Sequence, residues 1–207
     1  MIIDFSKELK IEKVKILFSN KEIKNFPSEK KIVSMNQIHS SKIIEVSKEK
    51  FNYESVDGLI STDIDNILEI SVADCLPIFI LNQKKFKIGV LHAGWRGLKN
   101  GIIRNLTKVL NINNESYSDF KIFIGPSISQ KNYEVKKDFL KYFDEEFFLI
   151  INGRYFLDLK KIAVEQLNFE GFKNIKVSEM CTFDNLGFHS FRRNKTKKRM
   201  KGYIYCE

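Results

Sequence analysis

The chain has 207 residues, 43% of them hydrophobic, and this size and composition allow one continuous core, so we expect a single domain over residues 1–207. Its formal net charge is +9, from 35 basic and 26 acidic residues, and no apolar run is long enough for a membrane span or a signal peptide. The cysteines Cys75, Cys181 and Cys206 are widely separated and form no C-x-x-C pair, which argues against a disulfide framework. We therefore expect a cytoplasmic protein that does not bind membranes.

Eight short segments rich in Ile, Val or Phe predict β-strands. In chain order they are residues 31–39, 41–47, 57–62, 68–82, 86–93, 121–127, 174–181 and 201–207. Three further segments repeat apolar side chains at helical spacing and predict α-helices, over residues 97–110, 133–147 and 156–169. This mixture predicts an α/β (α+β) fold in which helices cover a central mixed β-sheet.

Three side chains that could carry chemistry stand at the edges of predicted strands. His39 lies between two strand-like runs in "MNQIHSSKIIEV", Cys75 lies in "SVADCLPIFIL", and His92 ends the run "IGVLH". At a strand edge or a turn, a side chain can leave the core and face a cleft.

These three side chains admit three interpretations. Each could be a buried, hydrogen-bonded residue, since free cysteine is among the most buried residue types. Cys75 could instead be a nucleophile with His92 as its base, as in cysteine hydrolases. In the third interpretation His39, Cys75 and His92 bind one zinc ion, because two imidazoles, one thiolate and an open fourth position form a catalytic zinc site. Zinc in such a site lowers the pKa of a bound water toward ~7.

The motif "HAGWRG", residues 92–97, joins one of these side chains to a predicted helix. Its glycines let backbone N–H groups approach a ligand closely, and the start of a helix favours an anion. Arg96 adds a planar set of donors suited to phosphate or carboxylate. Trp95 offers a flat face to a base, although a core tryptophan is the simpler interpretation. The turn therefore predicts an anion-binding element beside a candidate metal ligand.

The segment "FRRNKTKKRMK", residues 191–201, concentrates positive charge. Its cations are Arg192, Arg193, Lys195, Lys197, Lys198, Arg199 and Lys201. Such a segment could bind nucleic acid or a phosphorylated small molecule, or it could be a solvated surface. A nucleic-acid-binding module is the non-enzymatic alternative, but it leaves "ADC" and "HAGWRG" without a role, so nucleic-acid binding is not expected.

An ordered series of motifs resembles the laccase-domain family, long known as multicopper polyphenol oxidases and now understood as zinc-dependent purine nucleoside phosphorylases. The series is "QIHSSKIIEV", "DGLIST", "SVADCLPIFI", "GVLHAGWRG", "IGPSISQKNYEV", "FLDLKKIAVEQL" and "CTFDNLGFHSFRRNKTKKRM". It extends from about residue 36 to the last residue. "HAGWRG" with "ADC" upstream is its most specific part.

The resemblance implies both a reaction and a site. The family uses phosphate to cleave the N-glycosidic bond of adenosine, inosine, guanosine or methylthioadenosine, and it also has adenosine deaminase activity. By resemblance, His39, Cys75 and His92 bind zinc, and the partners are purine nucleosides and inorganic phosphate. The family fold is a single-domain layered sandwich similar to that of toxin-type cysteine hydrolases. Nothing in the resemblance predicts an oligomeric state.

Charge and position within the motifs predict roles for four more residues. Arg96, Arg192 and Arg193 are expected to hold phosphate, with surface or structural salt bridges as the alternative. Asp74, next to a ligand, is expected to orient that ligand or to move a proton, with a role as a turn residue as the alternative.

The chain departs from the family pattern in three places. Ser127 in "IGPSIS" stands where the family usually has cysteine, so this position is not expected to be an essential ligand. "FHSFRR" replaces the usual "FFSYRR", which leaves His189 outside the predicted ligand set. Residues 16–31 contain no clear counterpart of the family's "NLG…D" stretch, so affinity or substrate range could differ in this chain.

The number of histidines argues against the copper chemistry of the family's older name. A blue-copper site takes two histidines and one cysteine, and the copper cluster that reduces oxygen needs many more, whereas this chain has three histidines. Zinc is therefore the expected metal, and copper is not expected. A metal-free hydrolase with Cys75 as nucleophile remains the alternative to a zinc-dependent phosphorylase.

Overall fold

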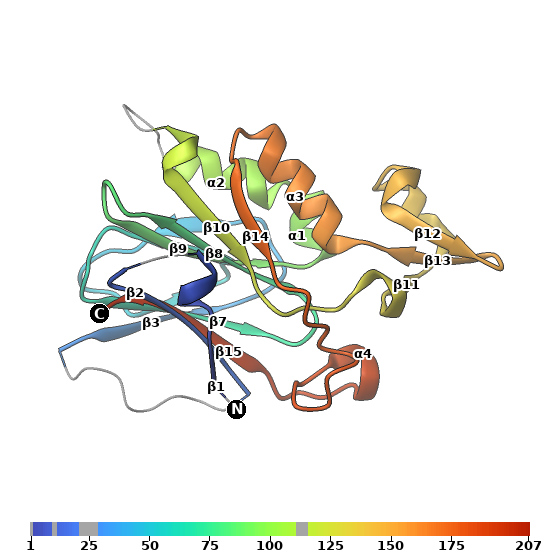
Figure 1. Cartoon of the computed structure of the whole chain (residues 1–207), viewed down its shortest axis with the longest axis horizontal. Helices are drawn as coiled ribbons and strands as arrows, with labels where there is room; N and C mark the ends of the chain where they lie inside the picture. The colour runs from blue at the N-terminus through green and yellow to red at the C-terminus, as the bar shows by residue number, and fades with distance from the viewer. Residues whose placement is uncertain (1, 10–11, 21–28, 111–115) are drawn as a thin grey trace.

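A computed structural model describes residues 2–9, 12–20, 29–110 and 116–207 of the chain. The strands of these residues form two six-stranded sheets and one three-stranded sheet, and the helices α1 to α3 lie on one side of the layers (Figure 1). The predicted mixed α+β class and the layered arrangement are confirmed, with two large sheets in place of one central sheet. No helix in the described ranges has the length and apolar character that crossing a membrane requires.

The sheet that packs against the helices, here called the helix-covered sheet, has the strand order β14-β10-β8-β9-β6-β4. Its central pairings are antiparallel and its two edge pairings, β14 with β10 and β6 with β4, are parallel. The strands are β4 (Ile43–Glu45), β6 (Gly58–Ser61), β8 (Leu76–Asn82), β9 (Lys87–Ala93), β10 (Phe120–Ile124) and β14 (Asn174–Val177). Each of these six strands overlaps a segment that the sequence predicts to be a strand.

The second large sheet, here called the outer sheet, has the order β1-β2-β15-β7-β3-β5. Its strands are β1 (Ile2–Asp4), β2 (Val14–Ser19), β3 (Lys31–Asn36), β5 (Asn52–Glu54), β7 (Asn66–Val72) and β15 (Met200–Cys206). The pairings of β3 with β7 and with β5 are parallel, and the others are antiparallel. The strands β3, β7 and β15 overlap segments predicted to be strands, whereas β1, β2 and β5 were not predicted.

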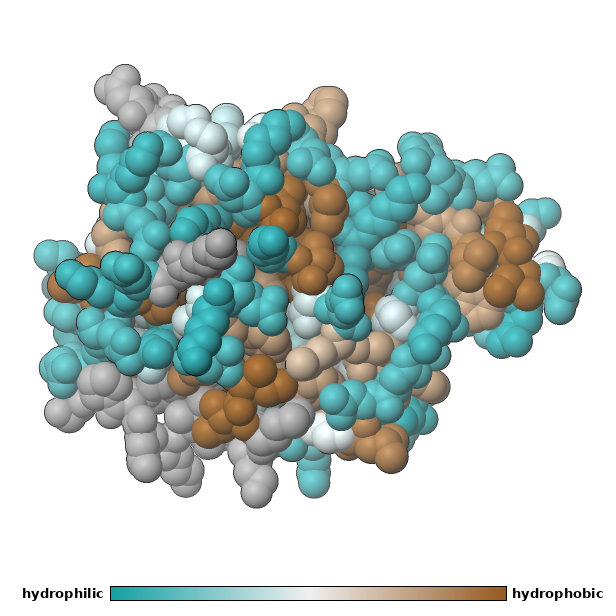
Figure 2. All heavy atoms as spheres, viewed as in Figure 1, coloured by the Kyte–Doolittle hydropathy of each residue, from teal (hydrophilic) through white to brown (hydrophobic). Residues whose placement is uncertain are grey.

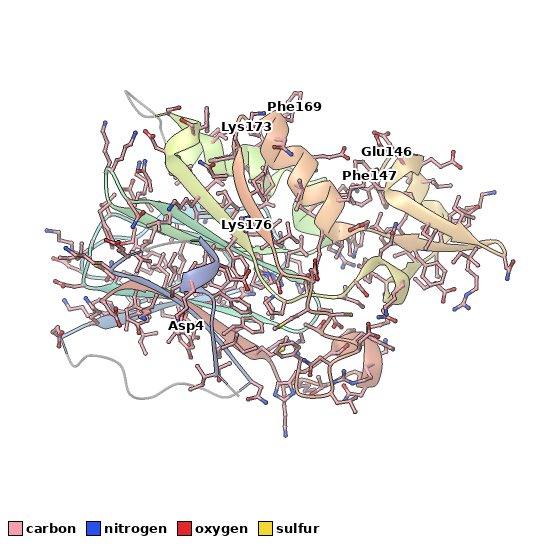
Figure 3. All side chains as sticks on the ribbon, viewed as in Figure 1. Asp4, Glu146, Phe147, Phe169, Lys173 and Lys176 are labelled. Atoms are coloured by element: carbon pink, nitrogen blue, oxygen red, sulfur yellow. The ribbon has the colours of Figure 1, made fainter. Side chains whose placement is uncertain are left out.

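A small antiparallel sheet projects from the side of the molecule (Figure 1). It contains β11 (Glu134–Val135), β13 (Arg154–Leu157) and β12 (Phe148–Ile151), in that order. Figure 2 shows an apolar patch at the outer end of this projection, where Leu149, Ile150 and Ile151 of β12 are exposed. Glu146 and Phe147, which precede β12, lie on the same projection in Figure 3.

The predicted helix over residues 97–110 is two helices, α1 (Trp95–Lys99) and α2 (Ile102–Leu110). The break falls at Asn100 and Gly101, where Gly101 has a φ of 78°, a conformation that glycine adopts without steric cost. The third helix, α3 (Leu159–Phe169), confirms the prediction for residues 156–169. Asp158 caps α3 by accepting a hydrogen bond from the backbone N–H of Lys161.

The predicted helix over residues 133–147 is wrong. This segment contains β11 and two 3-10 helices, η4 (Lys137–Lys141) and η5 (Glu145–Phe147). Phe139 and Tyr142 are three residues apart and both pack against Trp95, and a spacing of three also puts side chains on one side of a 3-10 turn. The other short helices are η1 (Ser6–Leu9), η2 (Tyr117–Asp119), η3 (Gln130–Asn132) and the α-helix α4 (Phe191–Asn194).

The helix-covered sheet is buried on both faces, which explains its nearly continuous apolar strands. In β8, Ile78 and Ile80 pack in the core shared with the helices, whereas Phe79 and Leu81 pack in the core between the two large sheets. The predicted strand over residues 68–82 is in fact two strands, β7 in the outer sheet and β8 in the helix-covered sheet. The turn between them therefore lies where the two large sheets meet.

Candidate metal centre and its cleft

Three turns at this junction bring together the three side chains that the sequence predicts to be metal ligands. His39 follows β3, Cys75 immediately precedes β8, and His92 lies near the end of β9. The possible ligand atoms of these three residues all lie within 4.8 Å of one another. The imidazole rings of His39 and His92 meet edge to face, with their centroids 4.7 Å apart. The predicted convergence of the three side chains is therefore confirmed.

Gly94 makes room for this group. The antiparallel pairing of β8 with β9 places Leu76 opposite Ala93, so Cys75 and Gly94 face each other just beyond the paired residues. A Cβ atom at Gly94 would lie 2.9 Å from Sγ of Cys75 and 3.4 Å from Cδ2 of His39. The first glycine of "HAGWRG" is therefore required because a side chain there would displace the sulfur.

A buried carboxylate, Asp57, connects two of the three candidate ligands. Its Oδ1 lies 2.8 Å from Nδ1 of His92, and the carboxylate also accepts hydrogen bonds from the backbone N–H groups of His39 (2.9 Å) and Ser40 (2.6 Å). His39 has a positive φ of 61°, a backbone conformation that surrounding contacts must maintain. Because Nδ1 of His92 donates to Asp57, the lone pair of the neutral imidazole lies on Nε2, the nitrogen that would bind a metal ion.

Asp57 was not among the residues predicted from the sequence to belong to the site. The signal was present in the motif "DGLIST", where one aspartate directly precedes a strand whose residues are all buried. The Asp57 side chain is itself completely buried. Burial alone would raise the pKa of this carboxyl, but hydrogen bonds from His92 and Ser40 outweigh burial and hold the pKa below its usual value. Asp57 is therefore an ionised carboxylate beneath the candidate ligands.

Cys75 and His92 influence each other's ionisation. Burial raises the pKa of the Cys75 thiol, but the positive charge of His92 and a hydrogen bond from His39 outweigh it and lower the pKa to about 6. Burial lowers the pKa of His92, but the negative charges of Cys75 and Asp57 and the hydrogen bonds to them outweigh it and raise the pKa to about 9. A thiolate, the form that binds metals and attacks carbon, is therefore favoured at neutral pH.

The group opens into a cleft of about 650 Å³. Its walls come from the residues around β3 and the β7–β8 turn, from the turn between β9 and α1, from Tyr133, and from the segment that begins with α4. Among the described residues, four cationic side chains line it: Arg96, Arg192, Lys195 and Arg199. The cleft thus places positive charge close to the candidate metal ligands.

Two of the three arginines expected to hold phosphate line this cleft. The guanidinium of Arg96 lies over the ring of Trp95, 4.4 Å from its centroid, and Arg96 is exposed. The guanidinium of Arg192 lies 4.8 Å from the ring centroid of Tyr133 and donates to the backbone oxygen of Glu134. Trp95 itself packs on Phe139 and Tyr142 at 4.8 and 5.7 Å between ring centroids, so it is both a packing residue and part of the cleft wall.

Arg193 is placed differently and does not line the cleft. Its guanidinium donates hydrogen bonds to the backbone oxygens of Thr182, Phe183, Asn185 and Phe188, at 2.5 to 3.4 Å. These bonds use donors that a phosphate would need. Arg193 therefore has a structural role, in which it holds backbone oxygens of the preceding segment. Its position gives no support to the expectation that it holds phosphate.

Asp74 lines the cleft, but both of its carboxylate oxygens are engaged. Oδ1 accepts a hydrogen bond from Oγ1 of Thr182 at 2.7 Å, and Oδ2 accepts one from the backbone N–H of Arg192 at 2.6 Å. Its φ is 90°, so it forms the tight turn that precedes Cys75. This geometry favours the turn role over proton transfer and links the turn to the segment that carries Arg192.

The remaining residues singled out by the sequence lie apart from the ligand group. Ser127 is buried, and its backbone pairs with that of Cys181 as an isolated parallel β-bridge. Neither residue lines the cleft. His189 also lies outside the cleft lining. The helix that begins in the motif "HAGWRG" was expected to be long and to favour an anion at its start, but α1 has only five residues. A short helix has a weak dipole, so Arg96 is the stronger anion-binding feature of this turn. Of the segment without a family counterpart, residues 21–28 lie outside the described residues.

Comparisons with known proteins agree with the motif series. The family model described as multi-copper polyphenol oxidoreductase laccase matches residues 14–207. A purine nucleoside phosphorylase of Campylobacter jejuni is 34% identical over 209 residues, which cover 98% of this chain and 90% of that protein. One of Aquifex aeolicus is 35% identical over 200 residues, covering 95% and 94%. The crystal structure of YlmD from Geobacillus stearothermophilus is similar with a TM-score of 0.80, at 29% identity over 88% of this chain and 75% of that chain.

Proposed function

The chain belongs to the multi-copper polyphenol oxidoreductase laccase family, and we propose that it is a zinc-dependent purine nucleoside phosphorylase. The observation that carries this proposal is the convergence of His39, Cys75 and His92 in a cationic cleft. The relatives named purine nucleoside phosphorylase, which align with nearly the whole chain, support the same reaction.

The reaction exchanges one bond at C1′ of the ribose for another. The C1′–N9 bond of adenosine, inosine, guanosine or methylthioadenosine breaks, and its electron pair leaves with the purine. An oxygen of inorganic phosphate forms a bond to C1′ and gives ribose 1-phosphate, or 5-methylthioribose 1-phosphate when methylthioadenosine is the substrate, and the purine takes up a proton. The protein must therefore hold a phosphate anion against C1′ and stabilise the charge that develops on the departing base.

The three converging side chains are the proposed zinc ligands. Two imidazole nitrogens and one thiolate suit zinc and leave a fourth position open. Asp57 leaves Nε2 of His92 free for the metal, and Gly94 leaves space for the sulfur of Cys75. A zinc ion bound there would supply a Lewis acid in the cleft.

The cationic side chains near this group are the proposed phosphate ligands. The guanidinium of Arg96 lies over the ring of Trp95 and donates no hydrogen bond within the described part of the chain, so its donors are available to an anion. Arg192 donates one N–H to Glu134 and is held against Tyr133, which fixes its orientation. The aromatic faces of Trp95 and Tyr133 line the same cleft and offer contact surfaces to a purine.

Two further chemistries remain available to the same residues. Adenosine deamination, expected from the family resemblance, would replace the 6-amino group of the purine with oxygen from water. A metal-free hydrolase would use the thiolate of Cys75 with His92 as its base, which their ionisation would allow. The names of the relatives favour phosphorolysis over this hydrolase.

The test is metal analysis followed by a two-substrate assay. The purified protein should contain stoichiometric zinc, and it should convert inosine to hypoxanthine only when phosphate is present, with ribose 1-phosphate as the second product. Cys75→Ala should lose both zinc and turnover, whereas Cys206→Ala, which changes a cysteine of β15 outside the cleft, should retain both. Zinc retained in Cys75→Ala, or base release without phosphate, would contradict the proposal.

A further inference from the structure

The cleft contains more positive charge than a neutral nucleoside and one phosphate require. Arg96 and Arg192 flank the aromatic walls beside the candidate metal centre. Lys195 and Arg199 also line the cleft, and the proposed phosphorolysis gives them no role. They belong to the basic segment 191–201, whose function the sequence left open between a ligand site and a solvated surface.

The four cations come from two parts of the chain, Arg96 from α1 and the other three from the segment 191–201. Arg96 is in α1, directly after β9 of the helix-covered sheet. Lys195 and Arg199 lie between α4 and β15, and β15 belongs to the outer sheet. Arg192 lies in α4 and donates to Glu134 of the small sheet. Cations from two parts of the chain therefore line one cleft of about 650 Å³.

Local hydrogen bonds fix the segment that carries Lys195 and Arg199. Lys195 has a left-handed φ of 54°, and its backbone N–H donates to the oxygen of Phe191 at 2.8 Å. The ammonium group of Lys195 lies 5.0 Å from the ring centroid of Phe191, another cleft residue. Nη1 of Arg199 donates to the backbone oxygens of Thr196 and Lys198, which leaves its other N–H groups for a ligand.

Carboxylates are few beside the four cationic side chains that line the cleft. Asp74 is the only carboxylate among the described residues that line it, and both of its oxygens are engaged by Thr182 and the backbone of Arg192. Lys195 and Arg199 form no salt bridge with any described residue. Cations lining a cleft without partner carboxylates attract anionic ligands strongly, because the low-dielectric walls focus the field.

We propose that the cleft binds purine nucleoside 5′-phosphates, with Lys195 and Arg199 holding the 5′-phosphate. This inference rests on the proposed function, because the metal-proximal part of the cleft is assigned to the nucleoside and to inorganic phosphate. The 5′-phosphate then occupies a subsite distinct from that of inorganic phosphate. Phosphate oxygens suit both side chains, an ammonium as a point charge and a guanidinium as a planar donor.

The experiment compares inosine with inosine 5′-monophosphate. Calorimetric binding to the metal-loaded protein without phosphate should show the nucleotide binding about 10- to 100-fold more tightly, as expected for hydrogen bonds to a charged group. Lys195→Ala and Arg199→Ala should each reduce this ratio, and the double variant should bring it close to unity. Lys197→Ala is the matched control, since Lys197 is an exposed lysine of the same segment that does not line the cleft; the ratio should stay at the wild-type value.

Inhibition kinetics identify the subsite. The nucleotide should inhibit inosine phosphorolysis competitively against inosine and non-competitively against phosphate. Competition against phosphate would mean that both phosphates share the Arg96 and Arg192 site, and it would overturn the inference. Equal affinities for inosine and its 5′-monophosphate would also overturn the inference. So would tighter binding of the nucleotide that persists in the Lys195→Ala, Arg199→Ala double variant. If the binding ratio behaves as expected but inosine is not cleaved, the proposed function fails while the subsite remains.

Discussion

Asp57 and His92 form the hydrogen bond that organises the candidate metal centre, with 2.8 Å between Oδ1 and Nδ1. The same carboxylate accepts the backbone N–H of His39, so one buried side chain orients one candidate ligand and supports the turn that carries another. The backbone N–H of His92 also donates to the backbone oxygen of Asp57. The two residues are therefore joined by both their main chains and their side chains.

Replacing Asp57 should weaken metal binding more than it weakens the fold. In Asp57→Asn the amide can donate to Nδ1 of His92, which favours the tautomer with a proton on Nε2 and removes the lone pair that binds the metal. We expect zinc affinity to fall about 10- to 100-fold, measured by competition with a chromophoric chelator. Asp65→Asn, which changes an exposed aspartate on the β6–β7 turn, should bind zinc like the wild type. Equal affinity in the two variants would contradict the role of Asp57.

Gly94→Ala tests whether the sulfur of Cys75 needs the space that glycine leaves. The added Cβ would lie 2.9 Å from Sγ, and the backbone φ of Gly94 is −85°, which alanine adopts readily. The variant should therefore fold but bind zinc less tightly, as shown by circular dichroism and metal titration. The comparison is Gly153→Asn at the exposed β12–β13 turn, where a Cβ meets nothing within 4 Å. A Gly94→Ala protein with wild-type zinc affinity would show that the site can rearrange.

Arg96→Ala should raise the KM for phosphate while leaving zinc bound. Loss of hydrogen bonds from a charged donor to an anion corresponds to about 1.5–3 kcal/mol, or about 10- to 100-fold in affinity. Steady-state kinetics at varied phosphate and fixed inosine measure this change, with metal analysis of the same sample. Arg104→Ala, which removes an exposed arginine of α2 that does not line the cleft, serves as the control. An unchanged KM would remove Arg96 from the phosphate site.

Arg193→Ala should affect stability instead of phosphate binding. The guanidinium is the donor for backbone oxygens of Thr182, Phe183 and Phe188, and its loss leaves half-buried acceptors unpaired. We expect the free energy of unfolding to fall by about 1–3 kcal/mol, measured by urea denaturation. At a temperature at which the Arg193→Ala variant is still folded, its KM for phosphate should match that of the wild type. A raised KM with unchanged stability would restore Arg193 to the phosphate site.

The metal-free protein should have an unusually acidic thiol at Cys75. The pKa of this thiol is lowered from 9.0 to about 6, so the thiolate predominates above about pH 6 and is protonated below it. Alkylation of Cys75 by iodoacetamide, followed by mass spectrometry, should therefore rise as the pH passes through about 6 and reach a plateau near neutral pH. Zinc added before iodoacetamide should protect the Cys75 thiol from alkylation. A rise only near pH 9 would show that His92 and His39 do not stabilise the thiolate.

The local character of the structure could be predicted from the sequence to a large extent. The strands that contain or precede His39, Cys75 and His92 were recognised from their apolar composition, and α3 from its spacing of apolar residues. The segment over residues 133–147 was mistaken for a helix because residues three apart contact the same neighbour in a 3-10 turn as well. The strands β1, β2 and β5 gave weak local signals, since their stability depends on pairing with distant partners.

The side chains that could bind a metal were evident from the sequence, because two imidazoles and a thiolate are a property of residue type and motif. The concentration of positive charge in residues 191–201 was evident from the sequence as well. Which of these groups meet depends on the tertiary structure. Asp57 is 35 residues from His92 in the chain, and Arg192 and Arg193 are neighbours whose guanidinium groups have different partners. Hydrogen bonds and charge interactions act over a few ångströms in space, and the distance between residues along the chain does not specify that separation.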